Sequence, residues 1–355
     1  MIRNYIVIAL VFSTTATALS ADPWQLFETQ SQSSLRGLAA MNKDVAWACG
    51  SKGTVIRTVD GGQHWNSLRI PDLDAVEIRS IHVWGADQAI VATAGQPARI
   101  LKTNDGGQSW NMVYQHLSPR AFIDGLRFWD NLHGIAFSDP IESGMLIVTT
   151  ADGGVTWTEV ASEQIPHMRK NEAGFAASNS SLIVVGDKSA WIGLGGETGF
   201  ASRVFRTMDL GRHWTAHDVA PIQATASAGI FSLCFINDLS GVAVGGDFQR
   251  DAIGESNIAL TDDGGTKWRE PQQSRPRGYR SCVVSVLPAG FTKHVWVACG
   301  PTGCDWSKDR ESWNPLSDIG FHTMFTTEDG NIWASGAQGR IGILDEATWN
   351  RLISE

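Results

Sequence analysis

The sequence has no excess of positive charge and no long apolar run. Its 28 lysines and arginines are outnumbered by 37 aspartates and glutamates, which gives a net charge of −9. A nucleic-acid-binding protein needs a basic face to meet phosphate, so this balance argues against a nucleic-acid partner. No segment after the N-terminus approaches the ~20 consecutive apolar residues of a membrane-spanning helix. We therefore predict no nucleic-acid partner and no membrane span.

Metal and cofactor motifs are also missing. The five cysteines are an odd number, so at least one thiol stays free, although a tight loop could join Cys299 to Cys304. No Cys or His pairs have the spacing of a zinc site. The glycine-rich stretch Gly193–Gly199 is not followed by a helical pattern, which a nucleotide cradle requires. The sequence thus predicts no metal and no cofactor.

The N-terminus has the pattern of a secretory signal peptide covering residues 1–21. Arg3 precedes an apolar run from Tyr5 to Phe12, and small residues follow. A positive start, a short apolar core and a small-residue exit are typical of this signal, with cleavage expected after Ala21 or Ala18. We therefore predict an exported protein, periplasmic or secreted.

One phrase, Thr-x-Asp-x-Gly-x-x-Trp, recurs along the chain. Its five copies contain Asp60, Asp105, Asp152, Asp209 and Asp263, and two weaker copies contain Asp309 and Asp345. The copies are about 47 residues apart, close to the length of a four-stranded propeller blade. Seven copies therefore indicate seven blades.

Each repeat is typical of four short strands, with the Asp-Gly-Gly turn joining the third to the fourth. Glycine tolerates the positive φ of a tight hairpin, and the aspartate can accept backbone N–H bonds, so these aspartates are expected to be structural. The tryptophan is expected to fill the wedge between blades. We predict an all-β fold: a single seven-bladed β-propeller domain of four-stranded antiparallel blades over residues 22–355, acting as a monomer.

The repeated phrase is the Asp-box of bacterial neuraminidase (BNR) repeats. The mature chain resembles exported seven-bladed propellers related to the photosystem II stability/assembly factors of plants and cyanobacteria. This resemblance covers nearly all of residues 34–352 and implies proteins that hold or deliver other proteins. The phrases that carry it besides the Asp-box are Ser34–Leu38, Gly229–Leu233, Gly278–Ser281 and Gly300–Asp305.

Closure of the ring leaves two possibilities. The segment Trp24-Gln-Leu-Phe-Glu resembles a fourth strand, but the last repeat has its own candidate at Trp349-Asn-Arg-Leu. Trp24 therefore begins either an extra outer strand of the last blade or a replacement for its fourth strand. We favour the extra strand.

The loops between second and third strands are long and polar in the middle blades, and they share the face opposite the Asp-box turns. Because binding residues are often carried by long loops, this face is favoured as the functional one. One position of the first strands is expected to point into the central channel or its mouth. Around the ring it reads Arg36, Arg79, Asp124, Ala176, Phe231, Arg280 and His322.

Three arginines in a channel are costly to desolvate unless they are paired or used. One interpretation makes Arg36 and Arg79 struts of the channel that pair with Asp124 and with loop acids such as Asp139, Asp247 or Asp305. The other makes the channel mouth a binding site for a carboxylate, sulfate or phosphate, which arginine forks fit. Both interpretations stay open at this stage.

Two classes of function follow. The first is a non-catalytic binding or assembly factor for a protein or an anionic partner, which uses the loop-rich channel face. The alternative is a carbohydrate-active hydrolase or lyase, with Asp139 and either Asp247 or Asp305 as paired carboxylates. A sialidase is disfavoured, because Tyr114 ends an outer strand and Tyr279 is expected to point away from the channel.

Overall fold

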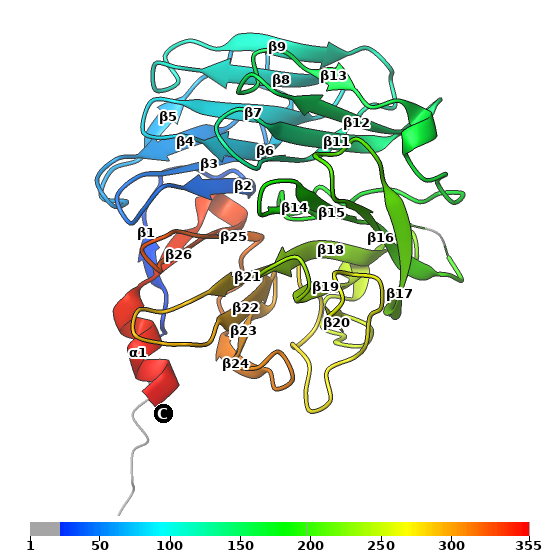
Figure 1. Cartoon of the computed structure of the whole chain (residues 1–355). Helices are drawn as coiled ribbons and strands as arrows, with labels where there is room; N and C mark the ends of the chain where they lie inside the picture. The colour runs from blue at the N-terminus through cyan, green and yellow to red at the C-terminus, as the bar shows by residue number, and fades with distance from the viewer. Residues whose placement is uncertain (1–21, 197, 355) are drawn as a thin grey trace, which may run out of the picture.

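Seven antiparallel sheets form a closed ring (Figure 1). The computed structural model describes residues 22–196 and 198–354. The first strand of each blade packs against the first strand of the next, and the last blade's first strand packs against that of blade 1. The predicted seven-bladed all-β propeller is confirmed, while the predicted signal peptide lies outside the described residues.

The strands follow one another blade by blade. Blade 1 contains β2 (Leu35–Ala40), β3 (Ala46–Gly50), β4 (Val55–Thr58) and β5 (Asn66–Leu68). Blade 2 contains β6 (Glu77–Val83), β7 (Ala89–Ala94), β8 (Ala98–Thr103) and β9 (Asn111–His116). Blade 3 contains β10 (Ile123–Phe128), β11 (Gly134–Ile141), β12 (Gly144–Thr150) and β13 (Thr158–Glu159). Blade 4 contains β14 (Leu182–Val185), β15 (Ser189–Gly193), β16 (Ala201–Thr207) and β17 (Thr215–Gln223).

The remaining blades are less regular. Blade 5 contains β18 (Ala228–Phe235), β19 (Gly241–Asp247) and β20 (Ile258–Thr261). Blade 6 contains β21 (Cys282–Val286), β22 (Val295–Gly300), β23 (Gly303–Ser307) and β24 (Asn314–Ser317). Blade 7 contains β25 (Thr323–Thr326), β26 (Ile332–Ser335), β27 (Ile341–Leu344) and the N-terminal β1 (Gln25–Phe27), and helix α1 (Glu346–Ser354) ends the chain.

Every complete Asp-box has the same hydrogen bonds. In blade 1 the Thr58 hydroxyl donates to Asp60 Oδ1 at 2.9 Å and accepts from the Gly62 amide at 2.9 Å. Asp60 Oδ1 also accepts from the His64 amide at 2.9 Å. Gly61 and Gly62 have φ of 72° and 84°, a region that favours glycine. The turn therefore fixes the hairpin between the third and fourth strands.

These turn bonds are donated to carboxylates, so they favour the ionised form. Hydrogen bonds from His64, Ser109 and Thr156 lower the pKa of Asp60, Asp105 and Asp152, respectively, to about 2. Asp209 and Asp263 accept the equivalent threonine and backbone bonds. All five aspartates are thus committed to their own turns.

Blade 5 departs from the four-stranded prediction. Its sheet has three strands, and the fourth is reduced to one bridge between Leu260 and Arg269. Pro271 follows two residues later and has no amide hydrogen to continue the ladder. The chain therefore leaves the sheet here and runs as a loop toward the channel face.

Ring closure differs from the favoured prediction. Strand β1 pairs with β27 and is the fourth strand of blade 7, so it replaces that strand instead of adding one. The last repeat lacks the two glycines of the Asp-box. Its Asp345 instead accepts from the Thr348 amide at 2.9 Å, directly before α1, as a helix-capping aspartate does. The segment around Trp349 is therefore helical, and the extra-strand prediction was wrong.

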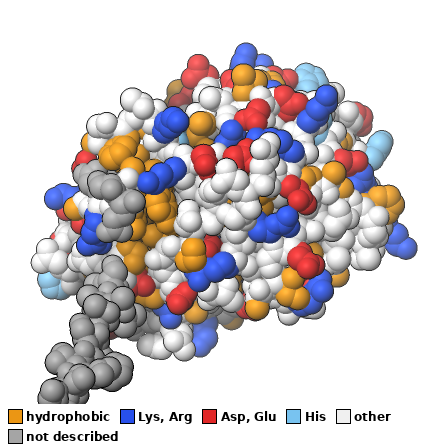
Figure 2. Space-filling view, turned by 90° about the horizontal axis from the view of Figure 1, so that it is seen from below, with side chains coloured by type: hydrophobic (Ala, Val, Ile, Leu, Met, Phe, Trp, Pro, Cys, Tyr) orange, Lys and Arg blue, Asp and Glu red, His pale blue; other side chains and the backbone are white. Residues whose placement is uncertain are grey.

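Three further findings concern the described residues. All five cysteines are free thiols, Cys299 and Cys304 being neighbours across the β22–β23 hairpin. No described helix is long and apolar enough to cross a bilayer. On the face drawn in Figure 2, acidic and basic side chains are interspersed.

Ring closure yields a stability prediction. Trp24 is 5% exposed and packs on Phe321 with ring centroids 4.8 Å apart, between blades 6 and 7. We expect Trp24→Ala to lower the free energy of unfolding by about 3 kcal/mol or more, because it leaves a cavity at the closure. Leu26→Ala is the control on the same segment, since Leu26 is 48% exposed and its loss should change stability by less than about 0.5 kcal/mol. Urea unfolding measures both, and equal effects would contradict closure by Trp24.

Candidate functional site

A cavity of about 490 Å³ opens at the channel mouth, and we call it the mouth cavity. Six of the seven aligned first-strand residues line it, and Arg280 does not. The lining residues are Arg36, Arg79, Phe122, Asp124, Asp139, Gly174, Phe175, Ala176, Ala177, Ala226, Phe231, Phe248, Tyr279, Ser281, Pro301 and His322. The lining combines two arginines, two aspartates, a histidine and several aromatic rings.

The floor of the mouth cavity is a segment that the sequence did not reveal. Residues 176–181 precede β14 and are buried. The Ser178 hydroxyl donates to the Ser281 carbonyl at 2.7 Å, and the Ser180 hydroxyl donates to Ser232 Oγ at 2.7 Å. We call residues 176–181 the axial plug, because it bonds to elements of blades 5 and 6 from the centre of the ring.

The axial plug also reaches the other blades. Thr323 of β25 donates to the Ser178 carbonyl at 2.8 Å. Asn179 Nδ2 donates to the Ile81 carbonyl at 3.1 Å, and its Oδ1 accepts from the Leu126 amide at 2.9 Å. With the Arg36 bond described next, the plug is tied to all six other blades. The polar run Ser178–Ser181, where other blades have an apolar strand, was the available sequence signal.

A β-bulge aims the cavity side chains inward. Strand register shifts at Arg36, Arg79, Asp124 and Phe231, so the aligned position is the bulged residue in four blades. A bulge leaves one residue unpaired and redirects its side chain. The bulges thus place these four aligned side chains at the cavity.

The two cavity arginines have different partners. Arg79 forms an ion pair with Glu77 and donates to the Ala176 carbonyl at 3.1 Å. Arg36 donates to the Ala177 carbonyl at 3.4 Å and has no ion pair within the described part of the chain. Burial and the nearby Arg79 charge lower the pKa of Arg36. Neither arginine pairs with Asp124, Asp139, Asp247 or Asp305, so the strut interpretation is wrong for both.

The acids of the mouth cavity lie beside each other. Asp124 is 1% exposed, and its Oδ2 has no hydrogen-bond partner among the described residues. Burial, and then the charge of Asp139, raise the pKa of Asp124 well above its usual value. Burial likewise raises the pKa of Asp139 to about 6, although its Oδ1 accepts from the Gly174 amide at 3.1 Å. The pair therefore carries less negative charge than two ordinary aspartates.

His322 lies on the cationic side of the mouth cavity. It is 9% exposed, and its Nδ1 has no partner among the described residues. Burial, and then the charges of Arg36, Arg340 and Arg79, lower the pKa of His322 to about 3. The imidazole is thus neutral at physiological pH, and Arg36 is the cavity cation that has no ion pair among the described residues.

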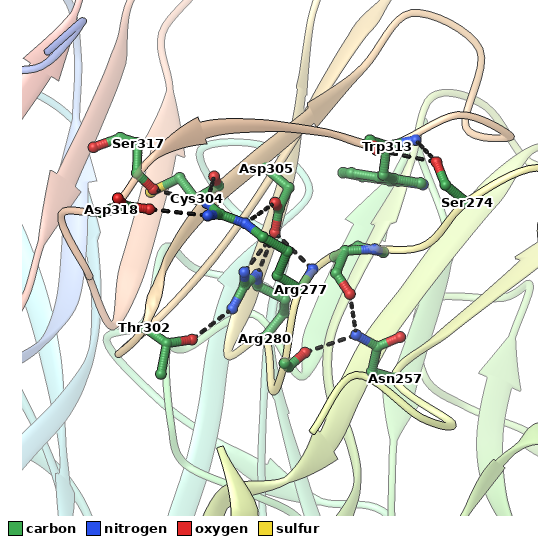
Figure 3. Close-up of polar contacts among 12 residues, drawn as sticks. Asn257, Ser274, Arg277, Arg280, Thr302, Cys304, Asp305, Trp313, Ser317 and Asp318 are labelled. Carbon is green, nitrogen blue, oxygen red and sulfur yellow. Dashed lines mark hydrogen bonds and ion pairs between the residues drawn. The ribbon is translucent and has the colours of Figure 1, made fainter. Parts of the chain in front are cut away.

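Arg280 points away from the mouth cavity into blade 6 (Figure 3). It is fully buried and donates from Nε to Asp305 Oδ2 at 2.8 Å. Arg277 donates to Asp305 Oδ1 at 2.8 Å and to Asp318 at 2.9 Å. Asp305 is 1% exposed, so both residues of the Arg280–Asp305 pair are committed to structure. The strut interpretation therefore describes this pair.

Tyr279 takes the place predicted for Arg280. It lines the mouth cavity and packs edge-on against Phe231 at 4.7 Å between ring centroids, whereas the sequence predicted that it points away. The cause is the preceding loop, which Asn257 holds by donating to the Pro276 and Gly278 carbonyls at 2.8 and 2.7 Å (Figure 3). This loop shifts the inward position by one residue.

Other predicted site residues do not meet. Asp247 is outside the cavity lining and accepts from Arg250 at 2.9 Å. The proposed carboxylate pairs of Asp139 with Asp247 or Asp305 are therefore not brought together. Sequence reasoning missed the aromatic side of the cavity, which consists of Phe122, Phe175, Phe248 and Tyr279 beside Phe231. Phe122 immediately precedes β10 and lies two residues before the bulged Asp124.

No group of three or more His, Cys, Asp or Glu side chains that could hold a metal is found among the described residues.

Comparison with known proteins agrees with this architecture. The family model for "Photosynthesis system II assembly factor YCF48" matches residues 16–170. Photosystem II assembly lipoprotein Ycf48 of Synechococcus sp. (strain CC9902) is 25% identical over 340 residues, covering 93% of this chain and 78% of that protein. The chain resembles the photosystem II assembly factors. The resemblance inferred from the Asp-boxes is thereby confirmed.

Two solved structures share the fold. The structure of YCF48 bound to D1 peptide has a TM-score of 0.61 and 20% identity, covering 92% of this chain and 98% of that chain. YCF48 from Cyanidioschyzon merolae has a TM-score of 0.60 and 18% identity, covering 91% of this chain and 99% of that chain. At these identities the likeness establishes the common propeller.

The raised pKa of Asp139 gives a pH prediction. A carboxyl whose folded pKa is raised binds more protons when folded, so its contribution to stability falls as pH rises from about 4 through 6. Asp139→Asn removes this loss. Its stability relative to the unmodified protein should therefore increase by roughly 1 to 2 kcal/mol between pH 4.5 and 7.5.

Asp247→Asn is the matched control, measured by urea unfolding at the same pH values. Burial raises the pKa of Asp247, but the hydrogen bond from Arg250 and other contacts outweigh burial, and the pKa is lowered overall. The ionised Asp247 therefore stabilises the fold above the ordinary pKa range of an aspartate, and this stabilisation is lost as the pH falls below that range. Because pH 4.5 to 7.5 lies above that range, the relative stability of Asp247→Asn should stay nearly constant over it. An equal increase for both variants would contradict the assignment for Asp139.

The buried Arg280–Asp305 pair gives a second stability prediction. Arg280→Met leaves Asp305 short of one buried cation, and we expect a loss of about 3 kcal/mol or more. Arg250→Met removes an exposed pair and should cost less than about 1 kcal/mol. Thermal unfolding compares the two. An unchanged melting temperature for Arg280→Met would refute the structural role.

Proposed function

We propose that this protein is a non-catalytic binding or assembly factor in an exported compartment, where it holds a segment of a protein partner in the mouth cavity. Residues 22–355 act as one domain and as a monomer in this proposal. The observation that carries it is Arg36, a cation with no ion pair among the described residues, at a cavity lined by aromatic rings. Such a site suits a carboxylate attached to an apolar side chain.

The relatives support a protein as the occupant. YCF48 has been solved bound to D1 peptide, and it shares the propeller of this chain. The dimensions agree, because a cavity of about 490 Å³ holds one or two side chains and leaves the rest of a peptide on the loop-rich face. The rigid ring and the axial plug preorganise the site, which lowers the entropic cost of binding.

The alternative is a carbohydrate-active hydrolase or lyase. One observation favours it: the pKa of Asp139, near 6, falls in the range of general acids. Such an enzyme also needs a second carboxylate at working separation. Asp124 lies beside Asp139 but is only 1% exposed, and Asp247 and Asp305 are outside the cavity lining. The binding function therefore fits the geometry better.

An array of synthetic 12-residue peptides from the exported and membrane proteins of the same organism tests the proposal. We expect a set of carboxylate-bearing peptides to bind, and Arg36→Gln to weaken them by about tenfold or more, because the charge-assisted bonds are lost in a buried site. Isothermal calorimetry on the best peptides measures the effect.

Arg212→Gln is the control, since Arg212 is exposed at the Asp-box rim on the opposite face. This variant should bind like the unmodified protein. Retention of the same peptides by Arg36→Gln, or an array without any bound peptide, would overturn the proposal.

A further inference from the structure

A second hollow lies beside the mouth cavity. It has a volume of about 430 Å³ and is lined by Arg120, Asp139, Pro140 and residues 168–173. We call it the basic groove. Asp139 lines both hollows, and Ala173 of the groove is followed by Gly174 of the mouth cavity. A chain that leaves the mouth cavity over Asp139 and Gly174 therefore enters the basic groove directly.

The lining of the groove carries more cations than acids. Arg120 and Lys170 are exposed, and neither forms an ion pair with any described residue, although the charge of Arg120 acts on the nearby Asp139 and Glu142. Of the two lining acids, Glu172 is 4% exposed and ion-paired with Arg203, and Asp139 is shared with the mouth cavity. Three lining cations, Arg120, Arg169 and Lys170, thus face two acids on a protein whose net charge is −9.

Buried contacts hold the segment that presents these cations. Arg203 Nε donates to Glu172 Oε1 at 2.7 Å, and Glu172 Oε2 accepts from the Arg169 amide at 2.9 Å. Arg169 donates to the Ala201 carbonyl at 3.0 Å and to Asp218 at 2.7 Å. The backbone on both sides of Lys170 is therefore fixed by blade 4. Charges on a fixed scaffold lose little entropy when a ligand binds.

We propose that the basic groove is a second subsite for the same partner segment and takes acidic side chains next to the residue that is anchored in the mouth cavity. This inference rests on the proposed function and adds the chemistry of the partner: an acidic peptide whose anchored residue is flanked by aspartates or glutamates. Arg120 and Lys170 are the contacting residues. Because both are exposed, they contribute through charge, and salt weakens their contribution.

The test uses the best-binding array peptide in two forms, with its flanking positions either all glutamate or all glutamine. We expect the glutamate form to bind about three- to tenfold more tightly at low salt, and the advantage to disappear toward 0.5 M salt. The double variant Arg120→Gln/Lys170→Gln should remove this advantage and leave the affinity of the glutamine form unchanged.

The matched control is Arg212→Gln/Lys267→Gln, which changes the same charge on exposed residues of the Asp-box rim. It should keep the full advantage of the glutamate form. Two results would overturn the basic groove as a subsite: equal affinities of the two peptide forms for the unmodified protein, or an equal loss of the glutamate advantage in both double variants. In either case, binding of the glutamine form would still support the mouth cavity as a site. If both forms of the peptide bind Arg36→Gln as tightly as they bind the unmodified protein, the proposed function is overturned instead.

A heparin-derived oligosaccharide serves as a third probe. The peptide proposal is overturned if the oligosaccharide binds the unmodified protein but not Arg120→Gln/Lys170→Gln, and the glutamate peptide has no advantage over the glutamine peptide. The groove would then bind an acidic polysaccharide. If the oligosaccharide binds more weakly than the glutamate peptide, the proposal stands.

Discussion

The axial plug is the constraint on which the site depends. A propeller's inner strands leave a channel along the axis, and in this chain the hydroxyl and amide groups of Ser178, Asn179 and Ser180 tie that channel to elements of the surrounding blades. Buried polar groups are tolerated when they are hydrogen-bonded, and here the bonds connect parts of the chain about 50 to 145 residues apart. The plug turns an open channel into a cavity with a floor, and its carbonyls receive the cavity arginines.

Burial and pairing then divide the arginines into two roles. Arg280 is fully buried and needs Asp305, because an unpaired charge at that depth would be costly. Arg36 remains at the cavity, where it donates to one carbonyl and forms no ion pair with a described acid, although the charge of Glu77 acts on it. Two other acids of the lining, Asp124 and Asp139, have raised pKa values because they are buried together. A cationic site within an acidic protein is the result.

The side chains on the two faces of the ring have different roles. On one face the Asp-boxes use their carboxylates within their own turns, as the bonds from Thr58 and His64 to Asp60 illustrate, so little of that acidity is left for a ligand. On the other face the first strands, the connections that lead into them and a few residues after the second strands build the mouth cavity and the basic groove. Structural turns on one rim and a lined cavity on the other fit a protein that holds a partner segment.

Local signals in the sequence determined the ring. The spacing of the Asp-boxes and their glycines set the number of blades and the hairpins, because these turns depend on residues within eight positions of one another. Alignment of the first strands of the blades also located Arg36, Arg79 and Asp124. Alternation cannot reveal a one-residue shift, so only the loop held by Asn257 decided that Tyr279 enters the cavity while Arg280 leaves it. The plug and the pairing of β1 with β27 were likewise decided by contacts between distant parts of the chain, which no local pattern encodes.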